Sequence, residues 1–210
     1  MTYRMVIFDF DGTLADTFPW FASVLNDVAA KYGFRTVAPE DVAWLRTLDS
    51  REIIRRLEVP AWKTPLIARH MRKLASAERT NFRLFPGVEH ALEALAREGL
   101  MLAVASSNSE ENVRAVLGET LAGRMQFACD ASLFGKARSI AKLVKRASVA
   151  PAAALYVGDE IRDAQAARAA GIAFGAVTWG YTAPGALAAA GPDHMFAAPA
   201  DILALLEKAS

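Results

Sequence analysis

The sequence predicts an α/β fold in which a doubly wound parallel sheet carries a helical insertion after its first strand. Along most of the chain, short continuous apolar runs alternate with helical patterns. Such runs are typical of strands that are covered on both faces. Between residues 17 and 84 the alternation stops, and only helical patterns follow one another. Alternating strands and helices favour a parallel sheet, so this stretch is read as an insertion.

Four apolar runs are predicted to be buried strands, at residues 5–8, 100–105, 154–157 and 173–178. All four are short and rich in Val, Ile, Leu, Ala and Phe. Their place between helical patterns predicts a Rossmann-like core, since parallel strands need a helical crossover to return to the same edge of the sheet.

The helical patterns have recognisable boundaries. Residues 88–95 repeat apolar side chains at helical spacing, and Gly99 ends the pattern. Ser109, which precedes two glutamates, predicts the capped start of another helix. Residues 140–145 and 163–170 show the same spacing. These segments supply the helices that the strands require.

The insertion reads as three or four helices, at residues 20–32, 39–48, 50–57 and 65–81. We therefore expect a catalytic α/β core formed by residues 1–16 and 85–210, with residues 17–84 as a helical cap. The cap has 12 Lys and Arg against 7 Asp and Glu, whereas the rest of the chain has 12 against 16. This positive charge indicates either solvated helix faces or arginines that face an anionic substrate.

Composition excludes several classes of protein. The chain has 210 residues, of which 53% are hydrophobic and 22% charged, and this is typical of a globular protein. A net charge of +1 gives no argument for binding nucleic acid or a membrane. The single cysteine, Cys129, cannot form a disulfide within the chain, which fits a reducing compartment. With no signal-peptide pattern either, we expect a soluble cytoplasmic protein.

Polar groups follow the predicted strands at one edge of the sheet. Asp9 and Asp11 come after the first strand, Ser106 after the second, and Asp159 after the third, while Lys136 starts a helix. Ligands in open α/β sheets bind at this edge. Each group alone has a plain structural explanation as a turn, a helix cap or a solvated residue. Their joint placement favours a functional site.

Clustered carboxylates repel one another unless a cation neutralises them or one of them is protonated. No Cys or His cluster accompanies the aspartates, and a set of oxygen ligands favours a hard ion, so we expect Mg²⁺. A lysine and a hydroxyl beside such an ion complete a site for a phosphoryl group.

Four motifs occur in order along the chain: DFDGTLAD at 9–16, VASSN at 104–108, LFGKAR at 133–138 and VGDEIRD at 157–163. On these motifs the sequence resembles the haloacid dehalogenase superfamily, on its phosphatase side. The insertion at 17–84 also matches the position of that family's cap. The stretch VTWGYTAPGAL at 177–187 resembles the phosphoglycolate phosphatases among its members.

The resemblance implies a role for each motif residue. Asp9 is the nucleophile that forms an aspartyl-phosphate, and Asp11 is the general acid that later activates water. Ser106 donates to a phosphate oxygen, and Lys136 compensates the negative charge. An aspartate two positions after the nucleophile is absent from the dehalogenases, so Asp11 favours phosphate chemistry over the removal of a halide.

The resemblance also implies the remaining ligands. The metal is held by Asp9, by the backbone carbonyl of Asp11 and by Asp159, while Asp163 either orients a metal-bound water or is a weaker ligand. The backbone amides of Ser107 and Asn108 assist in binding phosphate. Thr13 is expected beside the substrate in the first loop, where it forms hydrogen bonds.

The cap is expected to choose the substrate. Its small size suits a small phosphorylated metabolite, with no nucleic acid and no membrane as partner, in a monomer or a homodimer. Arg46 and Arg51 are candidate substrate contacts because arginine can bind a carboxylate through two hydrogen bonds. Trp20 is a third candidate, and the loop at 47–50 is expected to reach the cleft.

Two alternatives stay open beside a phosphatase that acts on a small phosphomonoester such as 2-phosphoglycolate. A β-phosphoglucomutase-like isomerase of sugar phosphates would have the same core and a similar cap. A phosphoacceptor signalling module also unites clustered aspartates, a lysine and Mg²⁺ on a parallel sheet. Such modules carry the phosphorylated aspartate in mid-chain and have no helical insertion.

Overall fold

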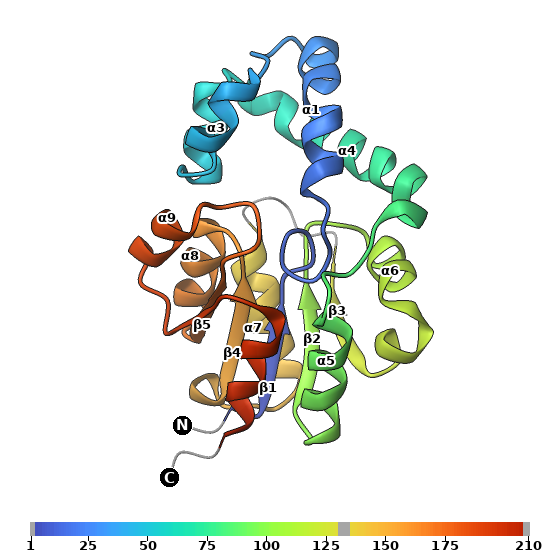
Figure 1. Ribbon diagram of the computed structural model, residues 1–210, viewed down its shortest axis with the longest axis vertical. Coiled ribbons are helices and arrows are strands. Elements are labelled where there is room, and N and C mark those ends of the chain that lie inside the picture. Colours follow the sequence, from blue (N-terminus) through green and yellow to red (C-terminus); the bar gives the residue numbers. More distant parts are fainter. Residues whose placement is uncertain (1–2, 130–134, 208–210) are drawn as a thin grey trace.

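The computed structural model describes residues 3–129 and 135–207 (Figure 1). Within these ranges the chain forms a six-stranded sheet in the order β3-β2-β1-β4-β5-β6, with every neighbouring pair parallel. The strands are β1 (Met5–Phe8), β2 (Met101–Ala105), β3 (Met125–Ala128), β4 (Ala154–Gly158), β5 (Ala173–Val177) and β6 (His194–Phe196). The predicted doubly wound parallel sheet is confirmed.

The central strand β1 is buried on both faces. All four of its residues have 0% exposed surface. Successive side chains of a strand point to opposite faces, so Val6 and Phe8 pack into one apolar cluster while Met5 and Ile7 pack into the other. A continuous apolar run is what such a strand requires.

Helices cover both faces of the sheet. On the face with Phe8 lie α5 (Val88–Arg97), α6 (Glu110–Ala122) and the 3₁₀ segment η5 (Pro199–Leu206). On the face with Ile7 lie α7 (Lys136–Arg146), α8 (Ile161–Ala170) and α9 (Pro184–Ala189). The apolar spacing in residues 88–95 is explained by this packing, because all four apolar side chains that repeat there are buried.

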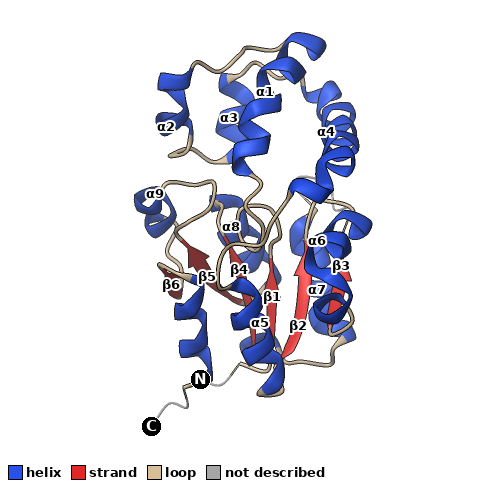
Figure 2. Cartoon of the chain, turned by 45° about the vertical axis from the view of Figure 1, so that its right-hand side comes forward, coloured by secondary structure: helices blue, strands red, loops and turns tan. Residues whose placement is uncertain are grey.

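In the segment between β1 and α5, the secondary-structure elements are all helices. Its α-helices are α1 (Phe18–Tyr32), α2 (Val42–Leu45), α3 (Ser50–Arg56) and α4 (Thr64–Glu78), joined by the 3₁₀ turns η1 (Pro39–Asp41), η2 (Ala61–Lys63) and η3 (Arg79–Asn81). It has a small apolar cluster of its own around Val37, Leu45 and Leu57. Figure 2 shows these helices stacked beyond the edge of the sheet at which the strands end. We call this segment, residues 17–84, the cap.

Two chain segments connect the cap to the sheet, and they run side by side. The N–H of Asp16 donates to the carbonyl of Arg83 over 2.9 Å, and the N–H of Phe85 donates to the carbonyl of Leu14 over 2.9 Å. A bridge also pairs Ala15 with Leu84. The insertion therefore leaves and rejoins the core at one place.

Two strands were missed by the sequence analysis, and both lie at an edge of the sheet. β3 has the sequence MQFA, in which buried and half-buried residues alternate, and β6 has only three residues. Edge strands are buried on fewer sides, so they lack the continuous apolar run that marks a central strand. The predicted helix at 39–48 was also too long, because the structure divides it into η1 and the four-residue α2.

The burial of α5 leads to a stability prediction. Leu92 is 1% exposed in the cluster beneath the sheet, so Leu92→Ala should leave a cavity and lower the free energy of unfolding by about 2–5 kcal/mol. Leu66→Ala, at a position 40% exposed in α4, is the matched control and should lower it by less than about 1 kcal/mol. Urea unfolding followed by circular dichroism measures both. Equal losses would contradict this packing.

Candidate active site

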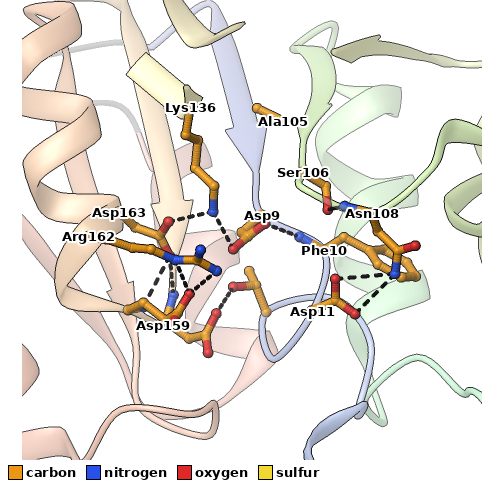
Figure 3. Close-up of polar contacts among 12 residues, drawn as sticks. Asp9, Phe10, Asp11, Ala105, Ser106, Asn108, Lys136, Asp159, Arg162 and Asp163 are labelled. Carbon is orange, nitrogen blue, oxygen red and sulfur yellow. Dashed lines mark hydrogen bonds and ion pairs between the residues drawn. The ribbon is translucent and has the colours of Figure 1, made fainter. Parts of the chain in front are cut away.

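Polar side chains meet at the edge of the sheet where β1, β2 and β4 end (Figure 3). Asp9 directly follows β1, Ser106 follows β2, and Asp159 follows β4. Lys136 is the first residue of α7, and Asp163 lies in the first turn of α8. Parallel strands end at the same edge, which is why residues 9, 106 and 159 become neighbours. The four sequence motifs thus converge on one place.

Lys136 is the central cation of this cluster. Its Nζ lies 2.6 Å from Asp9 Oδ2 and 2.6 Å from Asp163 Oδ1, and all three side chains are at most 5% exposed. Burial alone would lower the pKa of the Lys136 ammonium, but the charges of Asp163 and Asp9 outweigh it and raise this pKa above its ordinary value. Lys136 therefore stays charged and joins the first motif to the fourth.

Asp9, Asp159 and Asp163 form a compact set of oxygen ligands. One carboxylate oxygen from each lies within 4.8 Å of the others, and all three residues are buried. Burial raises the pKa of Asp9 to about 7 and that of Asp159 well above its ordinary value. Carboxyl groups that resist ionisation in this way would be stabilised as carboxylates by a divalent cation. The donor set fits a hard ion, because it contains oxygen and no sulfur or imidazole.

The carboxylate of Asp159 is fixed at both oxygens. Thr13 Oγ1 donates to Oδ1 over 2.7 Å, and the N–H of Tyr181 donates to Oδ2 over 2.7 Å. Gly12 has a φ of +76°, and a Cβ there would lie 2.3 Å from Asp159 Oδ2. Only glycine permits both this backbone conformation and this approach. The loop after β1 is thus packed directly against Asp159.

Asp163 has contacts at both of its oxygens. Oδ1 accepts from Lys136, and Oδ2 accepts from the N–H groups of Asp159 (3.2 Å) and Glu160 (3.0 Å). These amides lie at the start of α8, where a carboxylate is favourable. Asp163 therefore holds the loop that carries Asp159. A direct bond from Asp163 to a metal stays a prediction.

Asp11 lies apart from the three clustered carboxylates, on the side of β2. Asn108 Nδ2 lies 3.3 Å from each oxygen of Asp11, and Thr17 also forms a hydrogen bond to this carboxyl group. Burial raises the pKa of Asp11, and the two hydrogen bonds offset part of that rise. Asp9 and Asp11 thus have separate partners, so they can hold different protonation states.

The second motif supplies a preorganised turn. The N–H of Asn108 donates to Ser106 Oγ over 3.0 Å, and Ser106 has 0% exposed surface. Asn112 Nδ2 fixes the side-chain oxygen of Asn108 from α6 over 2.9 Å. Ser107 is half-buried, and its carbonyl oxygen lies 3.4 Å from Nη1 of Arg72 in the cap. Ser106 and Asn108 are thereby held at the predicted place, beside Asp11.

Three residues predicted to contact substrate are found in different settings. Thr13 has 0% exposed surface and gives its hydroxyl to Asp159. Arg46 donates from Nε and Nη2 to two carbonyl oxygens of the core, at Tyr181 (2.8 Å) and Gly180 (2.7 Å). Arg51 is exposed at the start of α3. Contact of these three side chains with substrate stays a prediction.

The loop at 47–50, which was expected to reach the cleft, contacts the fourth motif. Ser50 Oγ donates to Glu160 Oε1 over 3.1 Å. Trp20 instead packs its ring against Phe82, with centroids 5.2 Å apart. No hydrogen-bond partner for its Nε1 is found among the described residues. The cap thus touches the core beside the carboxylate cluster.

Arg162 is a half-buried cation that the sequence analysis did not select. Its Nε and Nη2 pair with Glu160, while its buried Nη1 has no hydrogen-bond partner among the described residues. Burial alone would lower its pKa, but Glu160, Asp163 and Asp9 together raise it. Figure 3 shows it beside Asp163 and Asp159. Its position in VGDEIRD, next to a predicted ligand, was the available signal.

Tyr181 was missed for a different reason. It follows β5, and polar groups were sought only after the other predicted strands. The same reasoning from strand ends would have pointed to residues 178–182. The first two residues of LFGKAR, at 133–134, lie outside the described residues, so the third motif is described only from Gly135 onward.

Comparison with known proteins agrees with this geometry. A family model described as haloacid dehalogenase-like hydrolase matches residues 6–177. The phosphoglycolate phosphatase of Synechococcus elongatus is 36% identical over 202 residues, which cover 95% of each chain. That of Agrobacterium fabrum is 34% identical over 191 residues, covering 85% of this chain and 82% of its own.

Solved structures share the whole architecture. A candidate phosphoglycolate phosphatase from Lactobacillus plantarum has a TM-score of 0.82 at 25% identity, covering 98% of this chain and 100% of its own. A haloacid dehalogenase-like family protein from Streptococcus pneumoniae has a TM-score of 0.79 at 20% identity, covering 98% and 99%. The latter likeness shows the fold alone.

The paired contacts of Lys136 lead to a second prediction. Lys136→Met removes the cation and leaves two buried carboxylates without their partner, so the free energy of unfolding at pH 7.5 should fall by about 3–5 kcal/mol. Lys142→Met, on the exposed face of the same helix, is the control and should change it by less than about 1 kcal/mol. Unfolding by urea in chelator-treated buffer measures both.

The pH dependence of this loss has a definite sign. Asp9 already has a raised pKa, and removal of Lys136 raises it further, so the folded variant binds a proton that the unfolded chain has lost. The loss should therefore be smaller at pH 5.5 than at pH 7.5. A loss that does not change with pH would show that the ion pairs do not govern this site.

Proposed function

The chain belongs to the haloacid dehalogenase-like hydrolase family, on its phosphatase side, and we propose that it is a Mg²⁺-dependent phosphatase acting on a small phosphomonoester through an aspartyl-phosphate. The observation that carries this proposal is the placement of Asp9. Its carboxylate lies at the end of β1, beside the buried ammonium of Lys136 and close to two further carboxylates, with Asp11 held separately. A nucleophile, a cationic site and an acid are thus brought together.

Asp9 is the proposed nucleophile. Its Oδ1 accepts from the N–H of Phe10 over 2.8 Å and its Oδ2 pairs with Lys136, so the carboxylate has a fixed orientation. A carboxylate oxygen of Asp9 attacks phosphorus, and the bond from phosphorus to the ester oxygen breaks. Lys136 compensates the charge that builds up on the transferred phosphoryl group.

Asp11 is the proposed acid and base. Burial raises its pKa, which makes the protonated form of this group easier to reach, and in the proposed reaction the proton of that form passes to the departing ester oxygen. In the second half of the reaction Asp11 takes a proton from water, which attacks phosphorus and breaks its bond to Asp9. Inorganic phosphate is released. The hydrogen bonds from Asn108 and Thr17 keep Asp11 beside Asp9 but out of the carboxylate cluster.

The residues that would hold Mg²⁺ are Asp9 and Asp159, with Asp163 as a ligand or as the residue that orients a bound water. When bound, the ion neutralises the carboxylates and the phosphate oxygens and so permits their close approach. The all-oxygen donor set supports Mg²⁺ over metals that prefer sulfur or imidazole.

Phosphoglycolate is the first substrate to test. The two relatives from Synechococcus elongatus and Agrobacterium fabrum are named phosphoglycolate phosphatase, and the first spans nearly all of this chain. The carboxylate of such a substrate needs a cationic partner in addition to those of the phosphate. Arg162 has a buried Nη1 without a hydrogen-bond partner among the described residues, and Nη1 of Arg72 in the cap lies 3.4 Å from the carbonyl oxygen of Ser107. The single cysteine further supports a reducing compartment, and we expect the cytoplasm.

Phosphate release from a panel of small phosphomonoesters, including 2-phosphoglycolate and β-glucose 1-phosphate, tests the proposed function. With Mg²⁺ present, the wild-type chain should release inorganic phosphate, and Asp9→Asn should lower kcat by about 10⁴-fold or more because the nucleophile is lost. Conversion of glucose 1-phosphate to an isomer without phosphate release would favour the isomerase instead. No release from any ester would refute the phosphatase assignment.

Metal binding should stabilise the protein more at pH 8 than at pH 5.5. Burial raises the pKa of Asp9 to about 7, from an ordinary value of 3.8, so its ionisation costs the metal-free protein stability as pH rises between those values. Protons also compete with the metal below pH 7. Thermal unfolding with and without Mg²⁺ should therefore show the larger rise in Tm at pH 8. Asp159→Asn should reduce that rise, and an equal rise at both pH values would contradict the argument.

A further inference from the structure

The loop that follows β5, residues 178–183, lies between the carboxylate cluster and the cap. We call it the 178–183 loop. Trp179 Nε1 donates to the carbonyl of Thr13 over 3.1 Å, which ties the loop to the segment after β1. The sequence stretch that contains it was singled out above only for its resemblance to other phosphatases, and the mechanism does not use it. Its contacts suggest a role of its own.

On one side the loop forms hydrogen bonds to Asp159. The N–H of Tyr181 donates to Asp159 Oδ2 over 2.7 Å, and the N–H of Thr182 donates to the carbonyl of Asp159 over 3.3 Å. The approach is so close that a Cβ at Gly180 would lie 2.2 Å from Asp159 Cβ. Since neither Gly180 nor Asp159 has space to move toward the other, the loop determines where this carboxylate lies.

On its other side the loop forms hydrogen bonds with the cap. Arg46 Nη2 donates to the carbonyl of Gly180 over 2.7 Å, and Arg46 Nε donates to that of Tyr181 over 2.8 Å. In return, the carbonyl of Arg46 accepts from the N–H of Ala183 over 2.7 Å. The guanidinium also lies over the ring of Phe18 in α1, 5.0 Å from its centroid. Arg46 is thus held in place within the cap.

One peptide unit connects these two sets of contacts. The carbonyl of Gly180 and the N–H of Tyr181 belong to the same planar amide, and in a trans peptide they point in opposite directions. This amide therefore accepts from the cation of Arg46 on one side and donates to the anion of Asp159 on the other. Hydrogen bonds linked in this way polarise one another, and those to charged groups are the strong ones.

The side chain of Tyr181 makes a second connection, to Asp11. Its hydroxyl lies 2.9 Å from Thr17 Oγ1, and Thr17 forms a hydrogen bond to Asp11. Its ring packs against Phe18 and Phe21 of α1, with centroids 5.0 and 5.6 Å away. The backbone and the side chain of one residue thus reach the two carboxyl groups that have different proposed roles.

We propose that Arg46 is a positioning residue, which presses the Gly180–Tyr181 amide onto Asp159 when the cap lies on the core, so that cap docking strengthens the hold of Asp159 on the metal. This inference rests on the proposed function for the role of the metal. In this proposal Arg46 binds main-chain carbonyl groups of the core, whereas the sequence analysis had predicted that it contacts substrate. Tyr181 is its partner and orients Asp11 through Thr17.

Calorimetric titration of the full chain with Mg²⁺, without substrate, tests the role of Arg46. Arg46→Met should weaken Mg²⁺ binding roughly 3- to 10-fold, somewhat less than loss of a direct partner of a metal ligand. Arg46→Lys keeps one donor and should fall between Arg46→Met and the wild type. Arg69→Met, which removes an exposed arginine of α4, is the matched control and should bind Mg²⁺ as the wild type does.

Tyr181→Phe tests separately the two contacts of Tyr181, its N–H with Asp159 and its hydroxyl with Thr17. It keeps the N–H that bonds Asp159 and the ring that packs on α1, and it loses only the hydroxyl that contacts Thr17. It should bind Mg²⁺ as tightly as the wild type, while kcat for phosphate release falls several-fold at nearly constant KM. Weaker Mg²⁺ binding by Tyr181→Phe would overturn this division of roles.

The remaining outcomes distinguish the inference from the proposed function. If Arg46→Met and Arg46→Lys bind Mg²⁺ as the wild type does, the inference is wrong even when the chain is an active phosphatase. A rise in KM alone would instead make Arg46 a substrate contact. If the wild type releases no phosphate but Arg46→Met still weakens Mg²⁺ binding, the proposed function fails and the positioning role stands. Circular dichroism of the metal-free proteins verifies that each variant is folded. If Arg46→Met is not folded, the Mg²⁺ affinity of Arg46→Lys decides the test.

Discussion

The ammonium of Lys136 lies between the carboxylates of Asp9 and Asp163, and the rest of the site depends on these two contacts. Both distances are 2.6 Å, and none of the three side chains has more than 5% of its surface exposed. Burial of so much charge is unfavourable unless each group has a partner. Lys136 supplies that partner from α7, and it pairs with the residue after β1 and with the first turn of α8. The ion pairs thus fix the positions of three separate segments relative to one another.

Even with Lys136 the cluster carries more negative than positive charge, and this excess explains its chemistry. Among the described residues, the hydrogen-bond partners of the Asp159 carboxylate are dipolar, namely the hydroxyl of Thr13 and the N–H of Tyr181, and burial raises its pKa well above the ordinary value. Arg162 adds a second, half-buried cation, but Glu160 accepts from two of its nitrogens. A site in this state has affinity for a further cation, and the cation in turn makes the approach of a phosphate favourable.

The cap contributes to this balance through geometry as well as through charge. Its excess of positive residues indicated either solvated helix faces or arginines that face an anionic substrate. The best-defined of them, Arg46, instead donates to two carbonyl oxygens of the 178–183 loop. Ser50 contacts Glu160, and Arg72 contacts the carbonyl of Ser107, so the cap meets the core at both the second and the fourth motifs. Docking of the cap and the arrangement of the catalytic groups are therefore connected.

The local sequence pattern was sufficient to predict much of the fold and of the candidate site. The continuous apolar runs located β1, β2, β4 and β5, because strands buried on both faces have no polar positions to interrupt them. The placement of Asp9, Ser106, Lys136 and Asp159 after strands or at a helix start was enough to predict that they meet, since parallel strands end at one edge. The helical nature of residues 17–84 followed from spacing alone.

The rest was decided only by the tertiary structure. β3 and β6 exist because neighbouring strands offer them hydrogen bonds, and three or four residues of mixed burial carry no pattern that would predict this. Arg46 and Tyr181 owe their places to contacts between segments far apart in the sequence, such as the 2.7 Å bond from Tyr181 N–H to Asp159. The sequence by itself determined which groups gather at the end of the sheet. Which of them hold the others in place depends on long-range contacts, whose geometry arises only when the chain is packed.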